Sequence, residues 1–199
     1  PSVPGALLKD MDIDACSGSI TLQWNSSIGV VTGYIGSLEN TTTLFKYNKT
    51  FNISGITPNQ TFSGLKNGTW YNFTVQAVVG YADTMTLYSK IHSQLIRTKV
   101  QVPNPPTNLS CLDATDRAII LKWIQPLLPN GDIISYSIII KRTQPSQEPY
   151  NVTSQGTNVQ YTVNGLTEGS LYTFQVYTMN ENYTSTSFAE VTSCATKAK

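Results

Sequence analysis

Apolar and polar residues alternate in several short stretches of the chain. Ile20, Leu22 and Trp24 are separated by Thr21 and Gln23. The same spacing of two recurs at three more places: Ile119, Leu121 and Trp123; Tyr71, Phe73, Val75 and Ala77; and Tyr172, Phe174 and Val176. A period of two places one face of a β-strand on a core and the other face in water. These stretches are therefore predicted to be half-buried strands.

The stretches between the strands contain turn residues and show no apolar stripe at helical spacing. Asn67-Gly68 and Asn130-Gly131 are typical turn pairs. Many short strands punctuated by turns are typical of β-sandwiches with about seven strands. The pattern predicts an all-β protein.

The strand pattern is written twice. Trp24 and Trp123 lie 99 residues apart, and Tyr71 and Tyr172 lie 101 apart. A period near 100 is the size of a domain and is too long for a solenoid repeat. The chain is therefore predicted to contain two copies of one sandwich.

A proline-rich segment, Val102–Pro106, separates the two copies. Proline fixes its own φ angle and lacks an N–H donor, so this linker should be short, extended and stiff. We predict domain boundaries at 1–100 and 101–199.

Several motifs occur in the same order in both copies. Together they resemble fibronectin type III domains, and the resemblance covers nearly the whole chain. In the second copy they are Pro105–Leu109, Leu121–Trp123 with Pro126, Asn130–Ile133 leading to Tyr136, Ile138 and Ile140, and Leu166 with Tyr172. The first copy repeats Trp24, Tyr34, Leu65 and Tyr71, but it lacks the proline after the tryptophan and has a shorter loop before Tyr34. The resemblance implies two tandem immunoglobulin-like seven-strand β-sandwiches. It also implies a tyrosine corner, in which the hydroxyl of Tyr71 or Tyr172 bonds back to the backbone.

Asparagine, serine and threonine are unusually frequent, and their order indicates the compartment. Ser and Thr make up 45 of the 199 residues, so about 3.4 of the 15 Asn would precede a Ser or Thr by two positions in a random order. Ten do so, each with a non-proline residue between: Asn25, Asn40, Asn48, Asn52, Asn59, Asn67, Asn72, Asn108, Asn151 and Asn182. This excess of N-glycosylation sequons predicts an extracellular or cell-surface glycoprotein carrying N-linked glycans.

The three cysteines allow at most one internal pair. On the fibronectin type III frame, Cys111 and Cys194 fall at inward positions of the first and last strands of the second copy, where they are expected to form a disulfide; the alternative is two buried thiols. Cys16 is placed in the loop before the second strand of the first copy. It is interpreted as a free thiol, a partner for another domain, or a partner for Cys111.

The charged residues nominate no catalytic or cofactor site. Thirteen Lys and Arg against 12 Asp and Glu give a net charge of +1, which does not favour a nucleic-acid partner. His92 is the single histidine, and phosphate-loop, HExxH and GxSxG motifs are absent from the sequence. Apolar runs are too short to cross a membrane, so no membrane contact is expected of this segment. We predict no enzyme activity, no cofactor and no resident metal.

One acidic run partly resembles a calcium-binding loop. Asp10, Asp12 and Asp14 alternate as in the start of a calcium loop, but Ala15 and Thr21 replace the Gly and Glu of an EF-hand. The run is interpreted as a solvated strand face, with weak calcium binding as the alternative.

The function predicted from these features is protein–protein recognition and spacing. The chain resembles part of the ectodomain of a receptor-type protein tyrosine phosphatase or a similar adhesion receptor, with one membrane span elsewhere in the parent. Its expected partner is a protein ligand or counter-receptor, and Ile139 and Tyr177 are the candidate contact patch because both should point outward. The alternatives are the ligand-binding region of a cytokine-type receptor, whose WSxWS box is absent, and a spacer in a secreted multidomain protein.

Overall fold

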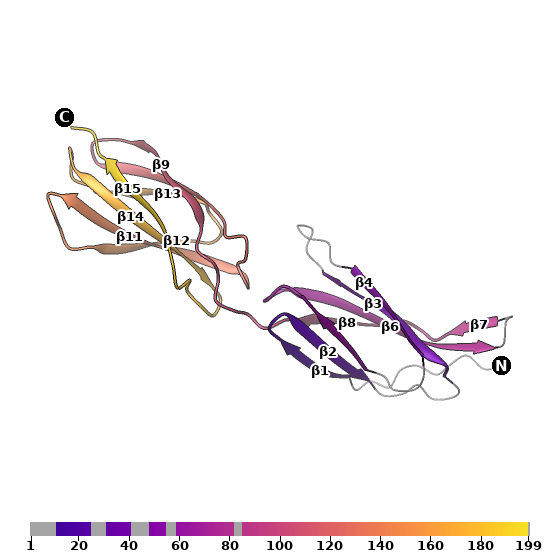
Figure 1. The fold of residues 1–199 in the computed structure, drawn as a ribbon. Helices are drawn as coiled ribbons and strands as arrows, with labels where there is room; N and C mark the ends of the chain where they lie inside the picture. The colour runs from indigo at the N-terminus through magenta and orange to yellow at the C-terminus, as the bar shows by residue number, and fades with distance from the viewer. Residues whose placement is uncertain (1–10, 25–30, 41–47, 55–58, 82–84, 199) are drawn as a thin grey trace. The chain divides into compact units, whose positions relative to one another are not determined.

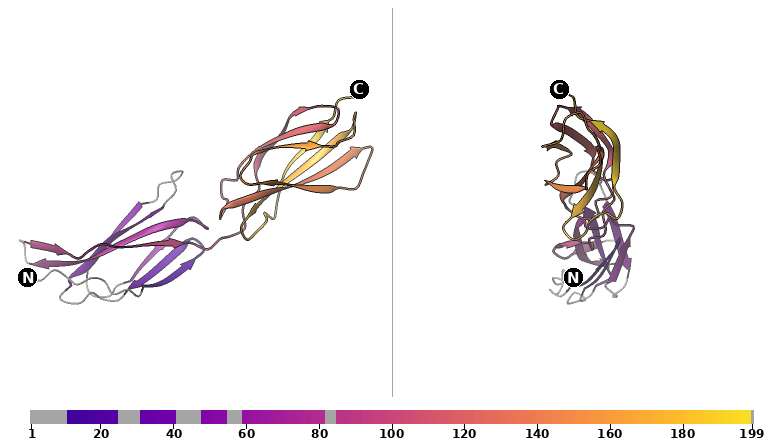
Figure 2. Two further views of the ribbon diagram at one scale, coloured as in Figure 1. Left: turned by 180° about the vertical axis from the view of Figure 1, so that it is seen from behind. Right: turned by 90° about the vertical axis from the view of Figure 1, so that its left-hand side faces the viewer.

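The computed structural model describes residues 11–24, 31–40, 48–54, 59–81 and 85–198. The chain divides into two compact units, Pro1–Lys99 and Val100–Lys199. Every regular element in the described part is a β-strand, and each unit consists of two sheets (Figures 1 and 2). Within this part no helix has the length and apolar character needed to span a membrane. The predicted all-β class with tandem sandwiches is confirmed.

The described residues of the first unit form eight strands in two antiparallel sheets. They are β1 (Met11–Cys16), β2 (Ser19–Trp24), β3 (Gly33–Asn40), β4 (Asn48–Ser54), β5 (Asn59–Ser63), β6 (Trp70–Tyr81), β7 (Met85–Tyr88) and β8 (His92–Arg97). One sheet has the order β1-β2-β5. The other has the order β4-β3-β6, with β7 and β8 both paired to β6.

The second unit contains seven strands with the same plan. They are β9 (Thr107–Ala114), β10 (Ala118–Ile124), β11 (Ile133–Gln144), β12 (Tyr150–Gln155), β13 (Gln160–Asn164), β14 (Leu171–Asn180) and β15 (Ala189–Ala195). The sheets have the orders β13-β10-β9 and β12-β11-β14-β15.

The alternating residues form the core of each unit. Trp24 is 2% exposed and packs edge-on against Tyr34, with ring centroids 5.4 Å apart. Trp123 is 1% exposed and meets Tyr136 in the same way at 5.1 Å. Each pair joins the two sheets of its sandwich, and burial of aromatic rings of this size is a main source of stability. The half-buried strands predicted from the sequence are therefore present.

A tyrosine corner closes each sandwich, as the family resemblance implied. The backbone N–H of Lys66 donates to the Tyr71 hydroxyl at 2.9 Å, and the N–H of Thr167 donates to the Tyr172 hydroxyl at 2.8 Å. A buried threonine completes the corner in both units. Thr98 donates to the carbonyl of Lys66 and Thr196 to that of Thr167, both at 2.6 Å.

A serine ahead of the last strand makes the same pair of backbone bonds in each unit. Ser89 separates β7 from β8; its N–H donates to the Ala77 carbonyl at 3.0 Å, and its Oγ accepts from the Ala77 N–H at 2.9 Å. Ser185 repeats both bonds with Thr178 at 2.9 and 3.1 Å. In its described part, the first unit has eight strands instead of the expected seven, because Met85–Tyr88 pairs with Val78–Tyr81 of β6 as a separate strand. The second unit has only a single bridge at this place, between Met179 and Thr184.

Candidate recognition surfaces

Metal-ligating groups and the single histidine are the first candidates for a site among the described residues. Within them, no group of three or more His, Cys, Asp or Glu is placed to hold a metal ion. His92 is half-buried at the start of β8, opposite Val75 on β6. The acidic run 10–14 lies partly outside the described residues, so its calcium alternative is untested.

The outer face of the β12-β11-β14-β15 sheet carries the residues expected to form a contact patch. Ile139 on β11 and Tyr177 on β14 are both half-buried and point away from the core, because the residues on either side of each are buried inward. The Tyr177 ring packs on Phe188, with centroids 5.3 Å apart, and Phe188 is 40% exposed. We call Ile139, Tyr177 and Phe188 the Tyr177 patch.

Phe188 could not be placed from the sequence, because it follows the loop after β14 and does not belong to the alternating pattern. Gln175 lies beside the patch on the same face of the sheet, opposite Ile139. It is only 7% exposed, because it lies between Ile139 and Glu190 and donates to Glu190 Oε1 at 2.7 Å. The Tyr177 patch is thus an aromatic pair beside an anchored Gln–Glu bond.

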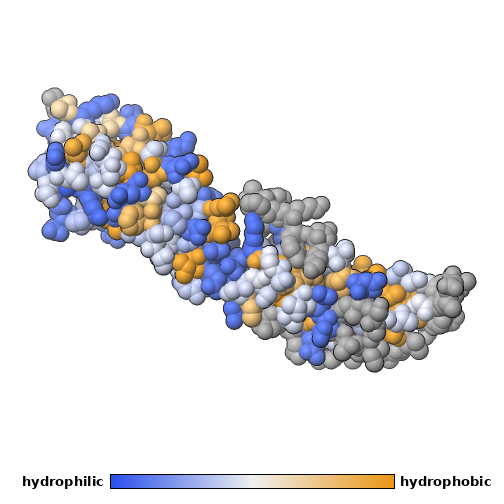
Figure 3. Space-filling view, in the orientation of Figure 1, coloured by the Kyte–Doolittle hydropathy of each residue, from blue (hydrophilic) through white to orange (hydrophobic). Residues whose placement is uncertain are grey.

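Apolar side chains are also exposed on β10 and in the β10–β11 loop. Ile124, Leu127 and Leu128 are 54%, 73% and 42% exposed. On the face seen in Figure 3, apolar areas of the second unit are separated by hydrophilic ones. Scattered exposed residues of this kind are normal on protein surfaces, so this loop alone does not mark a binding site.

Asn180 at the end of β14 organises the loops at one end of the second unit. It is 2% exposed, and its Nδ2 donates to the carbonyls of Gln101 at 2.8 Å and Pro129 at 3.1 Å. Its Oδ1 accepts from the N–H groups of Asn182 at 3.1 Å and Tyr183 at 2.8 Å. The side-chain amide of Asn180 therefore holds three chain segments together. No sequence motif predicted this role.

The Asn130-Gly131 turn adds to this arrangement. Asn130 adopts a φ of 51°, and its Nδ2 donates to the Val102 carbonyl at 2.7 Å. A Cβ on Gly131 would lie 2.7 Å from Glu181 Oε2 and 2.8 Å from Val100 Cγ1, so a larger residue there would displace these side chains. The linker was expected to be stiff because of its prolines. In the structure it is also bonded to the loops of the second unit.

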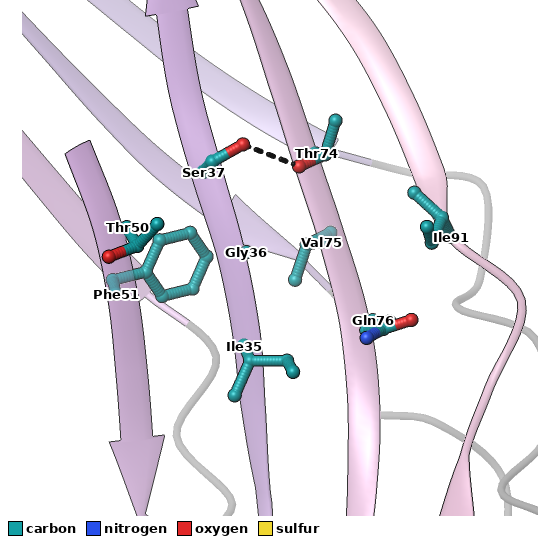
Figure 4. A pocket seen from close by; sticks show the side chains of 9 residues that line it. All are labelled: Ile35, Gly36, Ser37, Thr50, Phe51, Thr74, Val75, Gln76 and Ile91. Carbon is teal, nitrogen blue, oxygen red and sulfur yellow. Dashed lines mark hydrogen bonds between the residues drawn. The ribbon is translucent and has the colours of Figure 1, made fainter. Parts of the chain in front are cut away.

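A shallow hollow of about 390 Å³ lies on the β4-β3-β6 sheet of the first unit (Figure 4). It forms where Gly36 has no side chain; a Cβ there would clash with the Thr74 carbonyl oxygen and lie 2.7 Å from Phe51 Cζ. Ser37 and Thr74 hydrogen-bond at 2.9 Å on its rim. The remaining lining residues are Ile35, Thr50, Phe51, Val75, Gln76 and Ile91. The lining contains no ionisable side chain and cannot supply acid–base chemistry.

The sequons occupy different environments. Those with an exposed asparagine are Asn52, Asn59, Asn108, Asn151 and Asn182; those with a half-buried one are Asn40, Asn67 and Asn72. The Asn72 Oδ1 accepts a hydrogen bond from Ser93 Oγ at 2.8 Å. Asn48 lies in β4, and Asn25 lies outside the described residues.

Cys111 and Cys194 form a disulfide with a Cα–Cα distance of 6.2 Å. Cys111 lies on β9 and Cys194 on β15, so the bond joins edge strands of the two sheets. Pairing of Cys16 with Cys111, one of the alternatives drawn from the sequence, is therefore wrong. Cys16 is also not in a loop; it is the last residue of β1, opposite Ser19.

The chain is similar to known proteins in both of its units. The family model described as fibronectin type III domain matches residues 9–89 and 104–194. Tenascin-R of Gallus gallus is 26% identical over 171 residues, which is 84% of this chain and 11% of that protein. A kelch domain-containing protein of Saccharolobus solfataricus is 28% identical over 87% of this chain and 22% of its own length. Ephrin type-A receptor 5 of Homo sapiens is 31% identical over 57% of this chain and 12% of its own length. The chain thus spans a small part of each of these relatives.

Proposed function

This chain belongs to the fibronectin type III family as two consecutive domains, and we propose that it acts outside the cell as a non-catalytic recognition and spacing module of a larger receptor or adhesion protein. The fold itself does not give the function. Ten sequons and a disulfide favour the secretory pathway, where both modifications form. Ephrin type-A receptor 5 is a receptor by name, whereas the name of the kelch domain-containing protein of Saccharolobus solfataricus states no such role.

The observation that carries the recognition role is the Tyr177 patch. An aromatic pair standing outward on a rigid sheet presents a large contact area at a small entropic cost, and such residues often dominate binding energy. Asn151 lies directly opposite Ile139 in the β11–β12 register, so a glycan on Asn151 would lie beside Ile139. Tyr177 and Phe188 should therefore contribute more to binding than Ile139.

The finer proposal is that the parent protein is a receptor-type tyrosine phosphatase with a single membrane span. It rests on the resemblance of the tandem, sequon-rich units and of the Pro129-Asn130-Gly131 loop, which bonds to the linker in this structure. The remaining sequence of the parent tests it directly. A membrane span followed by a phosphatase domain supports the proposal, and a secreted protein without a span overturns it.

The recognition role is tested by presenting the whole chain to cell surfaces. The chain is secreted from animal cells, coated on fluorescent beads and added to a panel of cells that each express one surface protein. Binding to a defined panel member is the expected result. Beads that bind no member of a panel covering adhesion proteins and receptors would contradict a recognition role.

Matched variants then locate the contact. Tyr177→Glu should weaken binding at least tenfold, because a charge would be buried in the contact, and Ile139→Glu should weaken it less. Thr162→Glu, at an exposed position on β13 in the other sheet, serves as the control and should bind as the parent chain does. Unchanged binding by Tyr177→Glu would move the contact away from this face.

A further inference from the structure

Each of the four sheets ends in edge strands that could pair with a strand of another molecule. The fold alone does not explain what prevents this pairing. An edge strand presents free N–H and C=O groups on one side and can pair with a strand of another molecule. Soluble proteins block this pairing with charged residues, prolines, bulges or short strands. Each edge strand of this chain should therefore have one of these features.

Most edge strands of five or more residues carry a charge. The charged residues are Asp12 and Asp14 on β1, Lys49 on β4, Arg97 on β8, Asp113 on β9 and Glu190 on β15. Three edge strands, β5, β12 and β13, contain no Lys, Arg, Asp or Glu. These three need another device.

Strand β12 is the most open of the three. Its six residues Tyr150–Gln155 pair with Ser135–Ile140 of β11, which is also uncharged. Pro149 and Glu148 precede the strand and can guard only its beginning. Tyrosine, valine and threonine favour extended pairing. Two copies of this strand would meet without electrostatic repulsion.

A sequon occupies the strand instead. Asn151 and Thr153 are both exposed, and Asn151 stands opposite Ile139 on the outer face of the sheet. A glycan attached at Asn151 would project from the outer face at the edge strand, and its bulk would extend over the space that an added strand needs.

The same arrangement is found in the first unit on β5. The register partners of Asn59–Ser63 are Gln23–Ser19 of β2, and both segments are uncharged. Asn59 is exposed and begins the sequon Asn59-Gln60-Thr61.

Strand β13 corresponds to β5 in the second unit and has no sequon. There, an exposed lysine, Lys122, lies directly opposite Gln160, at the place where the first unit has Gln23 opposite Asn59. The second unit thus has a charged residue next to its edge strand β13, whereas the first unit has a sequon on its edge strand β5.

We propose that N-linked glycans on Asn151 and Asn59 close uncharged sheet edges against strand addition by a second copy of this chain. The inference rests on the proposed extracellular function, because sequons are modified only in the secretory pathway. The bulk and hydration of a glycan take the role that charged residues have on the other edges.

The test uses the whole chain secreted from animal cells, with glycan occupancy measured by mass spectrometry and mass in solution measured by light scattering over a concentration series. The parent chain should carry a glycan at Asn151 and remain monomeric. Asn151→Gln and Thr153→Ala each remove the sequon and should tighten self-association at least tenfold. Because Thr153→Ala leaves Asn151 in place, agreement between the two assigns the effect to the glycan. Hydrogen exchange should show new protection over 150–155 in the associated form.

Two controls separate the glycan from other causes. Asn151→Lys also removes the glycan but supplies a charge, and it should stay monomeric. Asn182→Gln removes an exposed sequon outside the strands and should also stay monomeric. The proposal is overturned if Asn151 is unmodified while other sequons are occupied, if both sequon variants stay monomeric, or if Asn151→Lys associates like Asn151→Gln. A chain without any glycan would instead remove the extracellular function on which the proposal rests.

Discussion

The position opposite the corner tyrosine shows how the two units differ. Ile96 stands opposite Tyr71 in the first unit, and Cys194 stands opposite Tyr172 in the second. Both residues are buried, at 4% and 5% exposure. In one unit the site is filled by an apolar side chain, and in the other by half of a disulfide. This position is buried in both units, while the link between the two sheets differs from one unit to the other.

The units also differ in what surrounds the common core. Seven sequons lie in the first unit and three in the second. The first unit adds Phe51, stacked on Phe73 at 5.8 Å, whereas the second has the Asn180 bonds between its loops. The two units therefore share the same alternating core residues but differ in their edge strands and loops. The edge strands and loops give each unit a different surface.

Removal of the disulfide should have the largest effect on this comparison. Replacing Cys111 and Cys194 together by Ala and Val is expected to lower the free energy of unfolding of the second unit by about 2–5 kcal/mol, because the unfolded chain regains the freedom that the cross-link removed. Hydrogen exchange resolved by peptide measures the two units separately in the whole chain. The first unit should not change. Cys16→Ser is the control and should leave the second unit as stable as before; equal loss in both units would contradict independent stabilisation.

The tyrosine corners should respond alike in the two units. Tyr71→Phe and Tyr172→Phe each remove the acceptor of a backbone N–H, that of Lys66 or Thr167. Each is expected to destabilise its own unit by about 1–3 kcal/mol, the cost of leaving a donor unsatisfied. The same exchange measurement checks this. A loss confined to one unit would show that the two corners are not equivalent despite their matching distances.

Tyr136→Phe should have the smallest effect. The Tyr136 hydroxyl is buried and makes no hydrogen bond of good geometry within the part of the chain that the structure describes, so its loss should change stability at pH 7 by less than about 1 kcal/mol. Burial raises the pKa of Tyr136, and the nearby Trp123 side chain opposes this only in part. Since the unfolded phenol ionises more readily, its contribution to stability is present below pH 10 and is lost as the pH rises beyond that value.

Chemical unfolding of the parent and Tyr136→Phe chains between pH 8 and 11 measures that difference. The parent should lose more stability than the variant above pH 10. Parallel curves would mean that Tyr136 ionises equally easily in both states.

Much of the fold could be predicted because its cause is local. The alternation at Ile20–Trp24 and Ile119–Trp123 appears directly as buried rows, since a strand exposes every second residue to the same side. The tyrosine corner could be predicted because it depends on a short separation between Tyr172 and the preceding turn. The break at Ser89 could not, because a single serine in a strand does not indicate where its hydroxyl will bond.

The two sandwiches, their tryptophan cores and the excess of sequons can be predicted from the amino-acid sequence alone, because each depends on periodicity or on neighbouring residues. Only the tertiary structure decided that Phe188 joins Tyr177, that Asn180 holds three segments, and that Asn151 and Asn59 lie on uncharged edges. These features depend on which strands become neighbours. That pairing brings together residues far apart in the chain, so no local pattern of side chains encodes it.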